Sequence, residues 1–140
     1  MEIKFHFEEP ASLTHRSQLK DFISKIFKRE GRRLHSLNYI FCSDESLLKI
    51  NSDFLQHDYY TDIITFDLSP PGSKEIEAEI YISVDRVKDN AQQFKSSLKE
   101  ELHRVIFHGV LHLCGYKDKG PKAEKLMRAK EAKYLALYFS

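Results

Sequence analysis

Residues 97–118 have the sequence SLKEELHRVIFHGVLHLCGYKD, and this stretch carries the strongest structural signals in the chain. Ser97 and Glu100 form a capping-box pattern, in which each side chain can satisfy a free backbone donor at the start of a helix. Apolar residues then recur at helical spacing, and Gly115 can adopt the backbone conformation that commonly ends a helix. The stretch therefore predicts one helix that starts after Ser97 and ends close to Gly115.

Two histidines lie four residues apart on this predicted helix. His108 and His112 should project from the same face, which is the spacing by which a helix offers two imidazoles to one ion. Gly115 lets the chain turn back towards the rings, and Asp118 follows six residues after His112. Two histidines and one carboxylate leave a coordination position open, as in catalytic zinc sites. We therefore expect one zinc-like ion at His108, His112 and Asp118, although paired histidines are also common without a metal.

The metzincin proteases have the same ligand spacing, with two differences. Their third ligand is usually histidine, and their general base is a glutamate directly after the first histidine. This chain has Asp118 and Gly109 at those positions. A metallopeptidase is therefore an unfavoured alternative, while the expected metal site is unaffected.

The rest of the chain alternates strand and helix patterns. Alternation of apolar and polar residues, or β-rich composition, predicts strands at residues 3–7, 37–42, 62–66 and 77–83. Helical spacing predicts further helices around residues 19–27, 47–55, 84–94 and 123–137. A short turn between the third and fourth strands predicts a hairpin. This order predicts an α+β domain with about five helices packed on a single mixed four-stranded sheet.

The starts of the first two helices have candidate capping residues. Ser12 or Thr14 is expected to cap the first helix, and Ser43 or Asp44 the second. The second helix is also expected to bury one largely apolar face, made of Leu47, Leu48, Asn51, Phe54 and Leu55.

The composition describes one ordinary globular domain, residues 1–140. No segment approaches the roughly 20 apolar residues that cross a bilayer, and the N-terminus does not resemble a signal peptide. We therefore expect a cytoplasmic protein without membrane contact, in which Cys42 and Cys114 are free thiols. Because the net charge is only +1, any contact with nucleic acid must come from a local patch, such as residues 117–133, with seven basic and three acidic side chains.

The metal-site stretch resembles a known family. Residues 108–119, HGVLHLCGYKDK, are similar to the H-G-x-L-H-L-x-G-Y-D-H signature of the bacterial YbeY-type endoribonucleases, which act in ribosomal RNA maturation. Residues 51–55 (NSDFL) and 61–66 (TDIITF) resemble the family's N-x-x-Y-R and T-D-V-L-S-F elements. Residues 79–83 (EIYIS) match a third element in part, and the blocks occur in family order.

The resemblance implies a metal-dependent hydrolase with an α+β fold and one Zn²⁺ ion. The family's zinc ligands correspond to His108, His112 and Asp118. The implied activity is cleavage of single-stranded RNA in 16S ribosomal RNA maturation and ribosome quality control. The implied partners are a ribosomal RNA precursor and the ribosome or ribosomal proteins.

The chain departs from the family pattern in residues close to the expected chemistry. Asp118 replaces a usual histidine, and Leu55 replaces an arginine thought to help catalysis. A leucine cannot neutralise a phosphate, so another cation must substitute or activity must fall. The candidate substitutes are His57, Arg104 and Lys117.

Three further residues have two interpretations each. Asp62 could orient a ligand histidine or the attacking water, or serve as a turn or cap residue. Arg104 could contact a phosphate from one turn before His108, or pair with Glu100 or Glu101. Cys114 could be a fourth metal ligand, but a buried thiol is the favoured interpretation.

The departures keep a second class of function open. In this alternative, the protein is a non-catalytic ribosome-assembly factor in which zinc stabilises the fold and basic patches bind RNA.

Overall fold

The structure is a computed structural model and describes residues 2–140. Within that range it contains four strands and five helices: β1 (Glu2–Phe7), α1 (Arg16–Arg29), β2 (Arg33–Cys42), α2 (Asp44–Leu55), β3 (Ile63–Asp67), β4 (Glu75–Ser83), α3 (Val84–Gln93), α4 (Leu98–Leu113) and α5 (Pro121–Tyr138). The predicted α+β class, the four strands and the five helices are confirmed.

The strands form one mixed sheet in the order β1-β2-β4-β3. β1 pairs with β2 and β2 with β4 in parallel, whereas β3 runs antiparallel to β4 as the predicted hairpin. β2 and β4 both begin earlier than predicted, because Arg33 and Leu34 pair with Glu75 and Ile76. β3 is left at one edge of the sheet, where its outer side is free to border a cleft.

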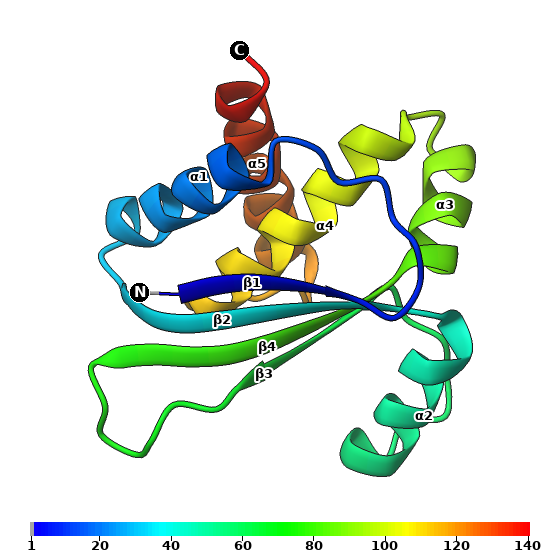
Figure 1. Ribbon diagram of the computed structural model, residues 1–140, viewed down its shortest axis with the longest axis horizontal. Helices are drawn as coiled ribbons and strands as arrows, with labels where there is room; N and C mark the ends of the chain where they lie inside the picture. The colour runs from blue at the N-terminus through cyan, green and yellow to red at the C-terminus, as the bar shows by residue number, and fades with distance from the viewer. Residues whose placement is uncertain (1) are drawn as a thin grey trace.

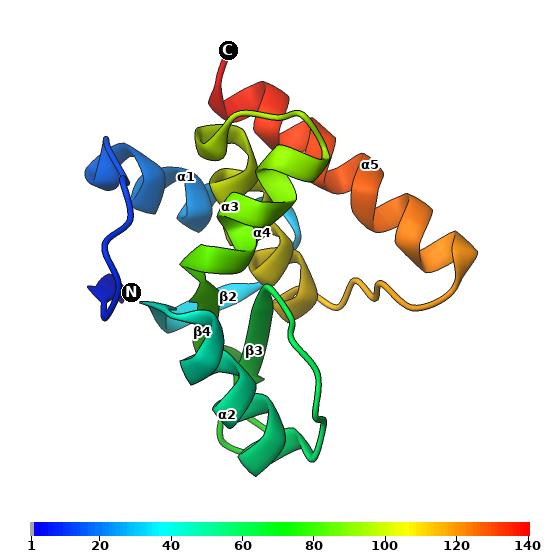
Figure 2. The ribbon, with the colours of Figure 1, turned by 90° about the vertical axis from the view of Figure 1, so that its right-hand side faces the viewer.

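The helices are divided unequally between the two faces of the sheet. Helices α1, α4 and α5 lie on one face, and α2 lies on the other (Figure 1). Alternate strand side chains point to opposite faces, so those of Leu37, Tyr39 and Ile80 are buried under the larger helical layer. A second, smaller core of Cys42, Leu47 and Ile64 lies on the side of α2. α5 passes behind α4 in Figure 1, and Figure 2 shows it at the side of α4, away from the sheet.

Two local predictions are wrong. The N-cap of α1 is His15, whose φ of 54° is left-handed and whose side chain does not cap the helix, so neither Ser12 nor Thr14 caps it. The end of α2 does not bury its apolar face, because Phe54 and Leu55 are 72% and 40% exposed. The reason is the direction of α2, whose C-terminal end extends away from the sheet (Figure 1).

The other predicted caps are present. Ser43 Oγ accepts a hydrogen bond from the Ser46 backbone N–H at the start of α2. Ser97 Oγ accepts one from the Glu100 N–H at the start of α4, which is one half of the predicted capping box. Among the described helices, none combines the length and the apolar character that crossing a bilayer demands.

Helix α4 approaches the sheet at a residue without a side chain. A Cβ at Gly109 would lie 2.7 Å from Ile80 Cδ1 and 3.1 Å from Ile63 Cδ1. Contacts below 3.0 Å are not tolerated without movement of a neighbour. Glycine at this position therefore lets α4 pack directly on β4 and β3, and it places the adjacent His108 beside the edge of the sheet.

Candidate metal centre and cleft

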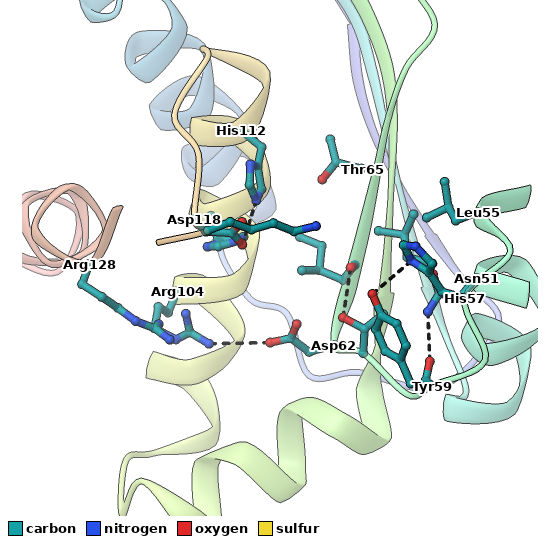
Figure 3. A pocket seen from close by; sticks show the side chains of 15 residues that line it. Asn51, Leu55, His57, Tyr59, Asp62, Thr65, Arg104, His112, Asp118 and Arg128 are labelled. Atoms are coloured by element: carbon teal, nitrogen blue, oxygen red, sulfur yellow. Dashed lines mark hydrogen bonds and ion pairs between the residues drawn. The ribbon is translucent and has the colours of Figure 1, made fainter. Parts of the chain in front are cut away.

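A cleft of about 510 Å³ is bordered by α4, by β3 and by the loop that precedes β3. His108, His112 and Asp118 line one wall, and His57 and Tyr59 line the opposite wall. Figure 3 shows the two walls facing each other, with Thr65 of β3 between them. The cleft thus brings together segments that are distant in the sequence.

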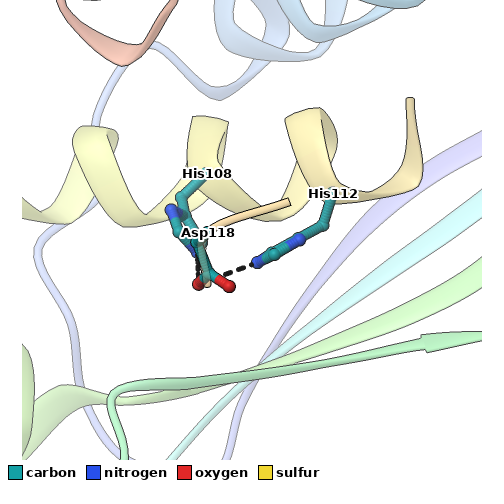
Figure 4. Close-up of side chains that lie close together, drawn as sticks. All are labelled: His108, His112 and Asp118. Carbon is teal, nitrogen blue, oxygen red and sulfur yellow. Dashed lines mark hydrogen bonds and ion pairs between the residues drawn. The ribbon is translucent and has the colours of Figure 1, made fainter. Parts of the chain in front are cut away.

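The three predicted metal ligands converge at one wall of this cleft. Asp118 Oδ2 lies 3.3 Å from His108 Nε2 and 3.2 Å from His112 Nε2. One donor atom from each residue lies within 4.8 Å of the others, so the group could hold a metal ion. Figure 4 shows Asp118 reaching back to both rings from the segment after α4.

The hydrogen-bond partner of Nδ1 in each ring indicates the role of Nε2. His112 Nδ1 lies 3.0 Å from the backbone oxygen of Tyr116, and His108 Nδ1 lies 2.5 Å from Glu131 Oε2. A carbonyl oxygen or an ionised carboxylate can only accept a hydrogen bond, so both Nδ1 atoms carry the proton. In the neutral rings, each Nε2 then presents a lone pair to the Asp118 carboxylate. A metal ion bound to all three groups, or a proton on each Nε2, would satisfy this arrangement, and two histidines with a carboxylate are suitable ligands for zinc.

Asp118 reaches the rings because the chain reverses after α4. Gly115 has a φ of +101°, and its N–H donates to the His112 carbonyl. The Tyr116 hydroxyl donates to Glu30 at 2.6 Å, which ties the reversed segment to the end of α1. The left-handed glycine and this tie position Asp118 beside the two rings.

Arg104 lies within a group of carboxylates. Its Nε and Nη2 atoms donate to the two oxygens of Glu101 at 2.8 and 2.6 Å, and its Nη1 donates to Glu131 at 3.1 Å. Asp62 lies 3.7 Å from Nη2. Burial would lower the pKa of Arg104, but the hydrogen bonds and charges of Glu101 and Glu131 raise it overall. The pairing with Glu101 was one predicted alternative, and the structure adds Glu131.

The carboxylate that contacts a ligand histidine through its outer nitrogen is Glu131 and not Asp62. Asp62 pairs with Arg104 and accepts a hydrogen bond from Asn90 at 3.3 Å. Within residues 2–140, the group on His108 Nδ1 is Glu131 of α5. Sequence reasoning missed Glu131, although an acidic residue on the helix face that also buries Met127 and Tyr134 was an available signal.

The opposite wall contains His57, a second candidate substitute for the missing arginine, and the aromatic ring of Tyr59. His57 Nδ1 lies 3.0 Å from the Tyr59 hydroxyl, and the two rings stack with centroids 5.1 Å apart. Asn51 donates to the Tyr59 carbonyl at 2.9 Å and so holds the loop. Lys117 does not line the cleft, whereas Lys119, from the same predicted basic patch, does.

Comparison with known proteins gives a consistent answer. A family model described as "Endoribonuclease YbeY" matches residues 4–138. The chain belongs to the YbeY family. A relative named "Endoribonuclease YbeY" from Cytophaga hutchinsonii is 55% identical over 135 residues, which cover 95% of this chain and 94% of the relative. One with the same name from Flavobacterium johnsoniae is 45% identical over 136 residues, covering 97% and 96%. The solution structure of a Thermotoga maritima protein has a TM-score of 0.65 at 28% identity, covering 99% and 89%.

Two cleft positions, Leu55 and Asp118, distinguish this YbeY chain from the motif given above. Leu55, in place of arginine, lines the cleft on the wall that carries His57. Cys114 lies next to Gly115 but is buried, and burial together with the charge of Glu30 raises the pKa of its thiol to about 12. A buried, protonated thiol fits the favoured interpretation of Cys114 as a packing residue rather than a ligand.

Proposed function

We propose that residues 1–140 act as one domain, a metal-dependent endoribonuclease that cleaves single-stranded RNA. The observation that carries this proposal is the convergence of two Nε2 lone pairs and the Asp118 carboxylate at the wall of an open cleft. The names of the relatives support RNA as the substrate. We further propose that the substrate is a 16S ribosomal RNA precursor and that the protein acts in the cytoplasm, in ribosome maturation and quality control with ribosomal partners.

His108, His112 and Asp118 would hold one Zn²⁺ ion, since nitrogen and carboxylate ligands suit zinc and leave a position open. When bound, such an ion supplies a Lewis acid that polarises a phosphoryl oxygen and acidifies water. Asp118 adds a negative charge that a third histidine would lack. This charge should hold the ion firmly while reducing its strength as a Lewis acid.

The chain's own residues would position the RNA. His57 faces the metal ligands across the cleft and would donate a hydrogen bond to a phosphate, in place of the arginine that the family motif has at the position of Leu55. Tyr59, which stacks on His57, offers a ring on which an unpaired base can stack. Lys119 lies beside Asp118 and would offset phosphate charge. Unpaired bases can reach a stacking surface that paired bases cannot, which favours single-stranded RNA.

The test is cleavage of a labelled single-stranded RNA by zinc-loaded protein, with a fully paired RNA of the same sequence beside it. We expect cleavage of the single strand, its loss on chelation and recovery on re-addition of zinc. His112→Ala should be inactive. His35→Ala is the matched control, because His35 is exposed and contacts Glu75 and Glu77 away from the cleft. Equal cleavage by His112→Ala would refute the proposal.

A non-catalytic ribosome-assembly factor is the second candidate, and one observation favours it. Leu55 carries no charge, and Arg104 is engaged by Glu101 and Glu131, so neither is free to meet a phosphate. In this case the wild type should bind single-stranded RNA without cleaving it. His112→Ala should then lose metal and stability but have no activity to lose.

A further inference from the structure

Glu131 is a buried carboxylate whose two oxygens are both occupied. It is 1% exposed and comes from α5, whereas the histidines come from α4. Its Oε2 meets His108 Nδ1 at 2.5 Å, and its Oε1 meets Arg104 Nη1 and Arg128 Nη1, each at 3.1 Å. With both oxygens bonded, the carboxylate has one orientation, and that orientation fixes the ring of His108.

Arg104 holds Glu131 from the side opposite His108. The guanidinium donates two hydrogen bonds to Glu101, a fork geometry that fixes its plane, and its Nη1 is left to meet Glu131. Glu101 is 2% exposed and contacts Arg104, but its carboxylate is not bonded to His108. The chain therefore contains two buried carboxylates on one arginine, of which Glu131 alone reaches a metal ligand.

We propose that Glu131 is a positioning residue for the metal centre, which keeps the proton of His108 on Nδ1 and directs the Nε2 lone pair at the ion. This inference rests on the proposed metal site. A carboxylate that accepts from the outer nitrogen of a ligand histidine fixes its tautomer and orientation and makes it a stronger donor. The same contact also joins α5 to α4, because Glu131 lies on α5 and His108 lies on α4.

The two ligand histidines are therefore not equivalent. His112 donates to a neutral backbone carbonyl, that of Tyr116, whereas His108 donates to a carboxylate. A charged acceptor forms the stronger hydrogen bond and shifts more electron density onto the ring. His108 should accordingly be the stronger donor to the ion, and the affinity of the site for metal should depend on Glu131.

The test is the affinity for Zn²⁺, measured by competition with a chromophoric chelator, in wild type, Glu131→Gln and Glu101→Gln. Each variant replaces one buried carboxylate on Arg104 by an amide of the same shape, so both should lose some stability. We expect affinity to fall about 10- to 100-fold in Glu131→Gln, as for lost supports of other ligand histidines. Glu101→Gln should stay within about threefold of wild type, because it does not contact a ligand.

The outcomes separate the inference from the function on which it rests. A wild type that binds no zinc would refute the metal site itself. A wild type that binds zinc with Glu131→Gln unchanged, or with both variants weakened equally, would refute the positioning role alone. A second readout needs no variant: the imidazole N–H of His108 should give a far-downfield proton resonance in the zinc-loaded wild type, and its absence would also overturn the inference.

Discussion

Gly109 of α4 packs so closely on Ile80 of β4 that a Cβ at residue 109 would lie 2.7 Å from Ile80 Cδ1. The contact lies next to His108, so it sets how near the metal ligands come to the edge of the sheet. Gly109, which stands where the metzincin proteases have their general-base glutamate, therefore has a packing role in this chain. Any side chain at residue 109 would point at β4.

Gly109→Ala should lower the free energy of unfolding by about 1 kcal/mol, because overpacking against Ile80 Cδ1 costs about 1–3 kcal/mol and the higher helix propensity of alanine offsets about 1 kcal/mol of it. Urea denaturation of the metal-free protein measures this change. Ile80→Val removes the clashing methyl group, so the cost of Gly109→Ala should be smaller in that background. An equal loss of unfolding free energy on Gly109→Ala in both backgrounds would show that the contact with Ile80 Cδ1 is not the cause of the loss.

Arg104→Met should be strongly destabilising, by about 3–5 kcal/mol, because it leaves the buried carboxylates of Glu101 and Glu131 without their counter-charge. Thermal and urea unfolding measure the loss. Arg33→Met, at an exposed position, is the matched control and should change stability little. A stable Arg104→Met protein that had lost RNA cleavage would instead assign Arg104 to the substrate.

The affinity of the cleft for RNA should depend on Lys119. If this side chain offsets one phosphate, Lys119→Ala should reduce the slope of log affinity against log salt by about one. Fluorescence anisotropy with a single-stranded RNA at several salt concentrations measures the slope. Lys74→Ala, in the exposed turn between β3 and β4, should keep the wild-type slope. The same loss in both variants would mean that binding is not centred on the cleft.

Local patterns predicted much of this molecule. Ser97, the apolar spacing and Gly115 fixed the limits of α4, because caps and periodicity act within a few residues. The return of Asp118 was also predictable, because a glycine and a short segment leave few directions for the chain. The geometry of the three ligands follows from these local features.

What the sequence did not reveal depends on how distant elements dock. Glu131 meets His108 only because α5 crosses α4, and no spacing within either helix indicates that contact. The exposure of Phe54 follows from the direction of α2 relative to the sheet. The contact of Arg104 with Glu131 was not predictable either, because Glu131 lies 27 positions further on.

Stability should fall in mildly acidic solution because of His103. This residue is 1% exposed, its Nδ1 lies 2.7 Å from the Lys99 carbonyl, and its Nε2 has no hydrogen-bond partner among residues 2–140. Burial lowers the pKa of His103 below its usual 6.5, and the bond to Lys99 offsets this only in part. The unfolded chain therefore takes up this proton at a higher pH than the folded protein.

The sign of the effect follows from that difference. As the pH falls below 6.5 towards the lowered pKa, proton uptake favours the unfolded state, and the free energy of unfolding decreases. Above 6.5 the contribution of His103 is constant. His103→Leu should show a smaller decrease than wild type between about pH 7 and pH 5, measured by urea unfolding of metal-free protein. Parallel curves for the two proteins would contradict the assignment to His103.

The most direct measurement is the metal content of wild type and Asp118→Ala, purified and dialysed side by side, with circular dichroism to verify that both are folded. If His108, His112 and Asp118 hold one ion, the wild type should retain about one zinc per chain and the variant should lose most of it, because two imidazoles alone bind weakly. A folded Asp118→Ala protein that keeps as much zinc as the wild type would contradict the account.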